Sequence, residues 1–350
     1  MRATHRAASL AALVLAGCGS GDAPASGAAT ICDSCLVLDP VVVLEDETGE
    51  RLSPSMRLAE WRGGFLASGV GEGSAQFAVF GPSGDFQRML GEPGEGPGQF
   101  FPIKNFAVDP GTLGLVVLDR KLTRVDSAFV TQARVVEGDY AQAFRIVRTR
   151  EGYVVNSFGG PSPLIFLDDS LQVMARIGSR AGQPDSNQFV LAAAADGGVW
   201  AARAAYAYEI RRHDGTGAQV GTLEPVREWF QRWSQDDNRA GADFRRVPLK
   251  PRITGLQELP DGRLAVLIVT ADANFAPLPD ADGEGPAFSP EEFDKYADTV
   301  VEVIDSATGA LLASMRRDEL YGGITPEGLI WRLEYVDDTA RAHLYRLVMR

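Results

Sequence analysis

Pro260-Asp-Gly-Arg-Leu-Ala-Val-Leu267 predicts a tight turn that runs directly into a β-strand. Glycine supplies the positive φ that a short hairpin needs, a neighbouring Asp, Glu or Pro favours the turn, and the branched residues that follow favour a strand. The same arrangement occurs in five further stretches: Trp61–Ser68, Asp109–Leu118, Thr149–Asn156, Ala195–Ala202 and Thr325–Arg332. The chain therefore contains six copies of one structural unit.

A second hairpin follows this unit in the first five copies. It alternates apolar and polar residues around a Gly, Asp or Ser turn, as a half-buried hairpin does. These hairpins cover Phe77–Leu90, Thr123–Val136, Leu164–Met174, Tyr208–Leu223 and Val300–Ser314. Six four-stranded copies arranged radially form a six-bladed β-propeller, so we predict an all-β protein of that class.

The sixth copy is one strand short when the chain ends. It supplies Tyr321–Thr325, Leu329–Tyr335 and Ala342–Met349, whereas the amino-terminal stretch Leu36–Glu45 has no copy of its own. We predict that this amino-terminal strand completes the sixth blade and closes the ring, because closure removes exposed sheet edges.

Two insertions lengthen the last two intervals between the turn glycines. In Glu224–Lys250 the large apolar residues follow helical spacing, which predicts a short helix packed on the propeller, with an aromatic lid over a ligand as the alternative. In Ala271–Lys295 the sequence Ser289-Pro-Glu-Glu292 predicts a helix start, with Ser as the cap and Pro in the first turn. The apolar residues of the first insertion are Val226, Trp229, Phe230 and Trp233.

The amino terminus has the features of an export signal. Arg2 and Arg6 precede the apolar run Ala7–Ala16, which is too short to span a bilayer; a plain secretory signal is the alternative. Leu15-Ala-Gly-Cys18 resembles the lipobox of bacterial lipoproteins, and this resemblance implies that residues 1–17 are removed and that Cys18 carries a lipid anchor. Residues 18–35 then form a flexible tether to the membrane of the cell envelope, with Gly19 favouring the outer membrane.

Cys32 and Cys35 form a C-x-x-C pair within this tether. In the oxidising compartment outside the cytoplasm we predict a local disulfide. A redox-active pair usually opens a helix, whereas this pair precedes a strand. A zinc site would need two more ligands besides the cysteines, and the mature chain has only two histidines, His213 and His343.

The net charge of −13 becomes −15 after removal of residues 1–17, because they contain Arg2 and Arg6 but no acidic residue. So acidic a domain repels nucleic acid and anionic lipid, and we predict neither as a partner. Attachment to the membrane would come from the lipid.

Gly91–Phe100, with Pro102, Phe106–Pro110 and Val116–Asp119, resembles the NHL type of propeller repeat. The stretch Thr299–Ser314 is similar to the outer hairpin of a blade in bacterial six-bladed propeller lipoproteins. The resemblance implies the same fold over residues 36–350 and a place in the cell envelope. Only the second blade carries the full NHL phrase, and such propellers have unrelated functions.

No catalytic residue or metal ligand is predicted. Gly91–Gly98 lacks the Lys-Ser/Thr of a P-loop, the chain has no G-x-S-x-G phrase, and His213-Asp214 falls in a hairpin turn. A metal-dependent hydrolase or lactonase, with Ca²⁺ as its metal, remains an alternative because acidic residues are abundant. A quinone-dependent dehydrogenase is less favoured.

A ring of cations is the candidate ligand site. Four of the six innermost strands begin near a basic residue, and aromatic residues take the equivalent places in the other two blades. We predict that the channel mouth binds an anion, such as an acidic glycan or a carboxylated peptide; ordinary surface residues paired with nearby acids are the alternative. The function predicted is a ligand-binding or protein-interaction scaffold that uses no cofactor. The candidate residues are Arg57, Lys104, Arg145, Arg252 and Tyr321, with Phe189 equivalent to Tyr321.

Overall fold

The computed structural model describes residues 35–135, 139–157, 162–178, 188–233, 247–276, 294–337 and 339–350. The predictions for the signal sequence, Cys18 and Cys32 lie outside these residues. Cys35 is buried directly before the first strand. The Cys32–Cys35 disulfide therefore stays a prediction.

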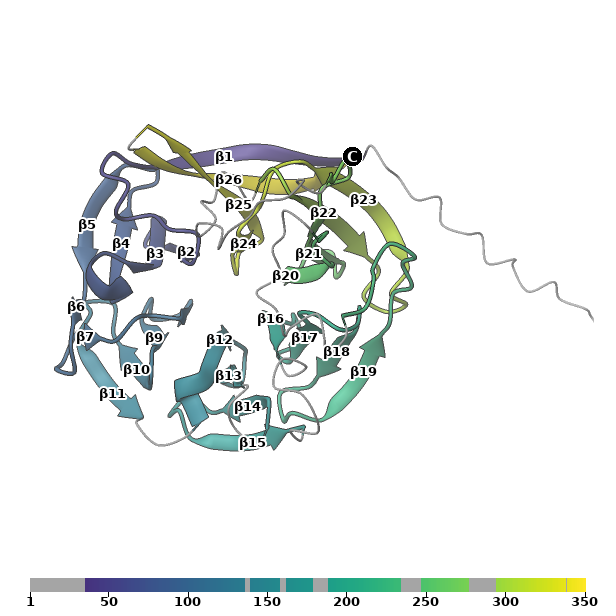
Figure 1. The fold of residues 1–350 in the computed structure, drawn as a ribbon. Coiled ribbons are helices and arrows are strands. Elements are labelled where there is room, and N and C mark those ends of the chain that lie inside the picture. The colour runs from purple at the N-terminus through teal and green to yellow at the C-terminus, as the bar shows by residue number, and fades with distance from the viewer. Residues whose placement is uncertain are drawn as a thin grey trace, which may run out of the picture. The chain divides into compact units, whose positions relative to one another are not determined.

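Six four-stranded antiparallel sheets surround a central axis (Figure 1). In the first five, consecutive strands run from the innermost to the outermost position. Blade 1 contains β2 (Arg57–Trp61), β3 (Gly64–Val70), β4 (Gln76–Phe80) and β5 (Phe86–Leu90). Blade 2 contains β8 (Asn105–Val108), β9 (Leu115–Leu118), β10 (Leu122–Val125) and β11 (Thr131–Val135). Blade 3 contains β12 (Ala143–Arg148), β13 (Tyr153–Ser157), β14 (Leu164–Leu167) and β15 (Val173–Ile177).

Blade 4 contains β16 (Phe189–Ala193), β17 (Val199–Arg203), β18 (Ile210–His213) and β19 (Gln219–Leu223). Blade 5 contains β20 (Arg252–Glu258), β21 (Leu264–Ala271), β22 (Ala297–Ile304) and β23 (Leu311–Arg317). The Gly-rich connection between blades 1 and 2 forms a short parallel pair, β6 (Glu92–Pro93) and β7 (Gln99–Phe100).

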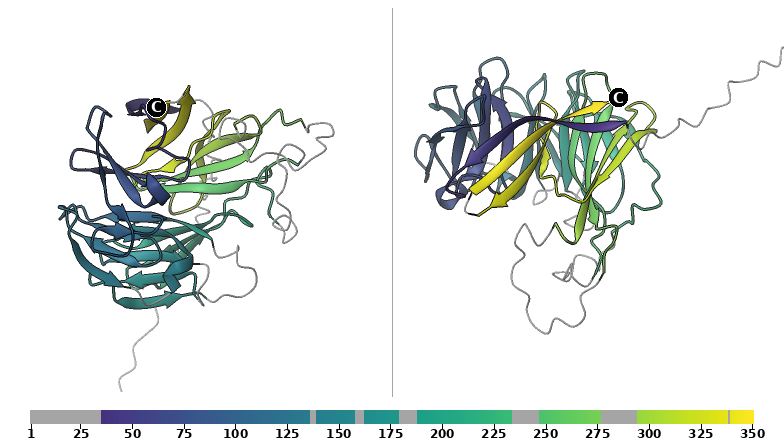
Figure 2. Two further views of the ribbon diagram at one scale, coloured as in Figure 1. Left: turned by 60° about the vertical axis from the view of Figure 1, so that its left-hand side comes forward. Right: turned by 90° about the horizontal axis from the view of Figure 1, so that it is seen from above.

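The sixth blade confirms the predicted ring closure. Its sheet has the order β1-β26-β25-β24, with β24 (Gly323–Ile324) innermost, then β25 (Leu329–Val336), β26 (Thr339–Met349) and finally β1 (Leu36–Asp46). β1 pairs antiparallel with β26 along its length, with a bulge at Val41. Figure 2 shows the purple β1 lying beside the yellow β26. The two ends of the described chain therefore share one sheet.

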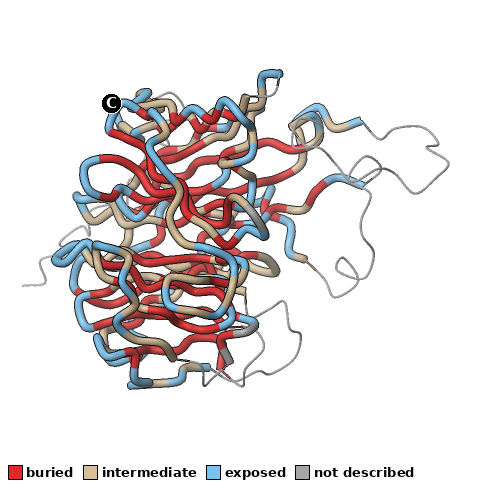
Figure 3. Tube along the Cα trace, turned by 90° about the vertical axis from the view of Figure 1, so that its left-hand side faces the viewer, coloured by how far each residue is buried: buried red, intermediate tan, exposed pale blue. Residues whose placement is uncertain are grey.

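The core consists of six main apolar clusters, each between two adjacent blades. Within β9, Leu115 and Val117 pack toward blade 1, whereas Val116 and Leu118 pack toward blade 3. Alternate residues of a strand point to opposite faces, so a strand that is buried on both faces is apolar throughout. Figure 3 shows the resulting buried strands and exposed turns.

The repeated turns have two physical requirements. Gly152, directly before the second strand of blade 3, lies so close to the third strand that a Cβ would be 1.9 Å from the Leu167 carbonyl oxygen. In the outer hairpins, an Asp carboxylate accepts backbone N–H groups two residues further on, and so fixes the turn. The Asp residues that do this are Asp126, Asp168, Asp214 and Asp305.

The helix predicted in the first insertion is not present in its described residues. These are residues 224–233 and 247–250, and the start of the second insertion, Ser289–Glu292, lies outside the described residues. Phe230 stacks on Tyr208, with ring centroids 5.1 Å apart, whereas Val226 is 87% exposed. Tertiary contacts thus override the helical spacing. Among the described residues the only helical turns are two 3-10 turns, Glu72–Ser74 and Asp139–Gln142, and none forms a helix that could cross a bilayer.

Candidate functional site

The innermost strands of all six blades line one axial cavity of about 570 Å³. Because these strands run in the same direction along the axis, their first residues lie at one end of the cavity and their turns at the other. Most of the wall is apolar. It includes Leu58, Phe106, Ile146, Val147, Val190, Leu191, Leu256, Ile324 and Trp331.

Arg57 and Arg145 line the cavity at the end where the strands begin. Desolvation, followed by the positive charges of Arg57 and Arg252, holds the pKa of Arg145 well below its ordinary value. Desolvation also lowers the pKa of Arg57 to about 10. The three predicted arginines are therefore close enough to repel one another, although Arg252 is not among the described residues that line the cavity.

The described residues offer few partners to the two arginines that line this end, Arg57 and Arg145. The Arg57 Nη1 donates to the Met56 carbonyl oxygen at 2.9 Å, while its Nε is buried without a hydrogen-bond partner. No described carboxylate pairs with Arg145. Arg252 donates to the Gln188 Oε1 at 2.6 Å. A guanidinium stays protonated in proteins, so Arg57 and Arg145 place two positive charges on the cavity wall that burial makes less stable.

Lys104 and Tyr321 are not among the residues that line the cavity. The Lys104 Nζ lies 5.2 Å from the centroid of the Phe144 ring. Tyr321 is buried in the cluster between blades 5 and 6, with its ring 5.9 Å from that of Tyr345. Its burial raises its pKa to about 12. The structure thus brings Arg57, Arg145 and Arg252 together and places Tyr321 in the core.

Two carboxylates lie at the opposite end of the cavity, a feature that the sequence analysis missed. Glu60 lies near the end of β2, and Glu327 lies in the turn between β24 and β25. Desolvation raises the pKa of Glu327, although hydrogen bonds from the Glu60 backbone and the Thr325 side chain offset part of this rise. The turn phrase itself contains Glu327, so its repeated position was a usable signal. The cavity therefore has a cationic end, an apolar middle and an end of mixed charge, where Arg62 and Arg148 lie with the two carboxylates.

The two histidines of the propeller do not line the cavity. His213 is 1% exposed, its Nδ1 lies 3.1 Å from the Gly217 carbonyl oxygen, and its Nε2 is buried without a partner. Burial is the main cause of its lowered pKa. His343 pairs with Glu334 at 2.8 Å.

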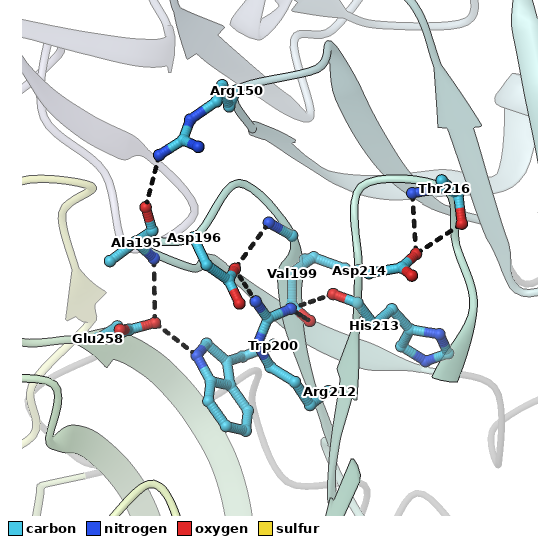
Figure 4. Close-up of polar contacts among 11 residues, drawn as sticks. Arg150, Ala195, Asp196, Val199, Trp200, Arg212, His213, Asp214, Thr216 and Glu258 are labelled. Carbon is cyan, nitrogen blue, oxygen red and sulfur yellow. Dashed lines mark hydrogen bonds and ion pairs between the residues drawn. The ribbon is translucent and has the colours of Figure 1, made fainter. Parts of the chain in front are cut away.

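The polar network around His213 joins neighbouring blades (Figure 4). Glu258 of blade 5 accepts hydrogen bonds from the Trp200 indole at 2.6 Å and from the Ala195 backbone at 3.2 Å. Arg150 of blade 3 donates to the Ala195 carbonyl oxygen at 3.1 Å. These contacts hold a blade 4 turn between its neighbours. In the part of the chain that the structure describes, no group of three His, Cys, Asp or Glu residues could hold a metal ion.

No family model and no curated protein matches the chain. Among solved structures, the chain is similar to a Bacteroides fragilis protein described as exported, with a TM-score of 0.61, 12% identity, and coverage of 91% of this chain and 97% of that one. It also matches the Pan2 WD40 domain of Neurospora crassa, at TM-score 0.47 and 10% identity over 90% of this chain and 97% of that one. A Bacteroides caccae protein of unknown function gives TM-score 0.37 and 10% identity, covering 76% and 99%. At such identities, likeness concerns the fold alone. The fold defines the chain as a six-bladed β-propeller.

Proposed function

We propose that the protein is a lipid-anchored binding protein of the bacterial cell envelope whose axial cavity binds a small anionic ligand. The observation that carries the proposal is that Arg57 and Arg145 line one end of the cavity, with Arg252 close to Arg145 and no described carboxylate paired to Arg145. Two cations in a confined, partly desolvated space attract an anion more strongly than the same charges in open solvent. Because the protein as a whole is acidic, the attraction for an anion is confined to the region of these arginines.

The binding proposal is tested with inorganic phosphate and acetate. The protein used lacks residues 1–18, because every described contact lies within residues 35–350. At constant ionic strength, millimolar anion should raise the melting temperature, since a ligand that binds only the folded state stabilises it. Arg145→Met should remove this shift. Arg176→Met, on the exposed outer strand of the same blade, is the matched control and should retain it. Equal shifts in both variants would contradict anion binding at the arginines.

The envelope proposal is supported by the lipobox-like Leu15–Cys18 and by similarity to a protein described as exported. Metabolic labelling with palmitate in a bacterial host should mark the wild-type protein. Cys18→Ser should remove the label and the association with membranes. A Cys18→Ser protein that is labelled like the wild type would rule out this anchor.

A further inference from the structure

The wall between the two charged ends restricts the chemistry of the ligand. Leu191, Val147 and Ile324 line the cavity from blades 4, 3 and 6, and each is only partly buried by the protein. Their apolar surface therefore faces the cavity space. Apolar surface that a ligand covers contributes roughly 25 cal/mol per Å².

The amide side chains in this wall are already engaged with the backbone. The Asn105 Nδ2 donates to the Phe144 carbonyl oxygen at 3.3 Å, and its Oδ1 accepts the Phe106 N–H at 2.8 Å. The Gln257 Nε2 donates to the Glu258 carbonyl oxygen at 3.1 Å. A sugar carries hydroxyls along its whole body, and each buried hydroxyl needs a hydrogen-bond partner. This wall is therefore a poor match for an acidic glycan.

The cavity also has a definite length. Arg57 and Glu60 are three residues apart on β2, which corresponds to about 10 Å along a strand. A ligand whose anionic group lies beside the arginines has about this distance for its body before it reaches Glu60 and Glu327. The far end also holds Arg62 and Arg148, which already contact the Ser127 carbonyl oxygen and Asp169, so a ligand with one anionic group beside Arg57 and Arg145 fits the cavity.

We propose that the ligand is a small amphiphilic carboxylate, with one anionic head at the arginine end and an aliphatic body along the apolar wall. This inference rests on the proposed function, because it requires the arginines to bind an anion. To the anionic head of the proposed function, it adds that the rest of the ligand is aliphatic. It also predicts that the affinity of the site for a carboxylate increases with the length of the carboxylate's apolar chain.

Isothermal titration calorimetry with acetate, butanoate and hexanoate tests the proposal on the protein without residues 1–18. Each buried methylene adds about 0.8 kcal/mol, or about fourfold in affinity, so hexanoate should bind roughly two orders of magnitude more tightly than acetate. Hexan-1-ol, which lacks the charge, should bind at least tenfold more weakly than hexanoate. Arg145→Met should weaken hexanoate to the level of the alcohol.

The apolar wall is tested by Leu191→Asn. This change should lower the affinity for hexanoate about tenfold and leave that for acetate unchanged. Val173→Asn is the control, because Val173 is 44% exposed on an outer strand of blade 3. Equal weakening of acetate and hexanoate by Leu191→Asn would contradict the assigned position of the body.

Three outcomes would overturn the inference, and they differ from failure of the proposed function. If acetate and hexanoate bind equally well and both depend on Arg145, the arginine site stands but the apolar body is wrong. If 6-aminohexanoate or digalacturonate binds more tightly than hexanoate, the ligand is a two-ended ion or an acidic sugar instead. If no anion binding depends on Arg145, the proposed function itself fails.

Discussion

Replacing Leu44 by alanine tests whether the amino-terminal strand is an integral part of the ring. Leu44 lies in β1, opposite Ala342 of β26, and its side chain is 0% exposed. It belongs to the cluster between blades 6 and 1, together with Met56 and Leu58 of blade 1. Truncation of a fully buried leucine removes its transfer free energy and leaves a cavity, which together cost about 2–5 kcal/mol. We expect Leu44→Ala to lower the free energy of unfolding by about 3 kcal/mol.

Val41→Ala on the same strand is the matched control. Val41 is 43% exposed at the bulge of β1, so its truncation should change stability by less than about 0.5 kcal/mol. Urea unfolding followed by tryptophan fluorescence gives both values from the shift in midpoint and the common slope. If Leu44→Ala costs no more than Val41→Ala, β1 does not seal the ring and the closure is refuted.

Three further predictions concern turns, pH and a buried carboxylate. In urea unfolding, Gly84→Ala should destabilise the protein by more than about 2 kcal/mol and Gly63→Ala by only about 1 kcal/mol. Both glycines have positive φ, but only a Cβ at Gly84 would lie 1.9 Å from a carbonyl oxygen of β1. Equal costs would contradict this close approach. Burial lowers the pKa of His213 below 6.5, so the unfolded chain takes up the proton first and the free energy of unfolding should fall as pH drops from 7.5 through about 6.5. His213→Gln should flatten this slope, and an unchanged slope would exclude His213 as its origin. Tyr208→Phe removes a 2.8 Å hydrogen bond to the buried Glu302, so urea unfolding should show a loss of about 1–3 kcal/mol in the free energy of unfolding. No loss would mean that water replaces the hydroxyl as the partner of Glu302.

Much of the fold was predictable because its signals are local. A turn needs its Gly and Asp at fixed offsets, and a strand that is buried on both faces is apolar throughout. Counting these signals gave six blades, and the spare strand at residues 36–45 matched the short sixth blade. Pairing of β1 with β26 then followed from the need to remove an open edge.

The first insertion shows where local signals fail. Its apolar spacing favoured a helix, yet the Nε of Arg227 contacts the Oε1 of Glu302 at 2.9 Å, and Trp233 donates to the Pro251 carbonyl oxygen at 2.8 Å. Glu302 and Pro251 lie outside the stretch of sequence whose apolar spacing predicted the helix. A buried carboxylate is costly unless it is paired, so the chain adopts the path that pairs Glu302.

By itself, the sequence determined the number of blades, the closing strand and the strand ends at which cations occur. Only the tertiary structure decided that Arg57 and Arg145 share one cavity, that Tyr321 packs into the core and that Glu60 lies at the opposite end. The physical reason is that turn and strand preferences act within a few residues. The direction of a side chain at the axis depends instead on how six twisted sheets pack against one another.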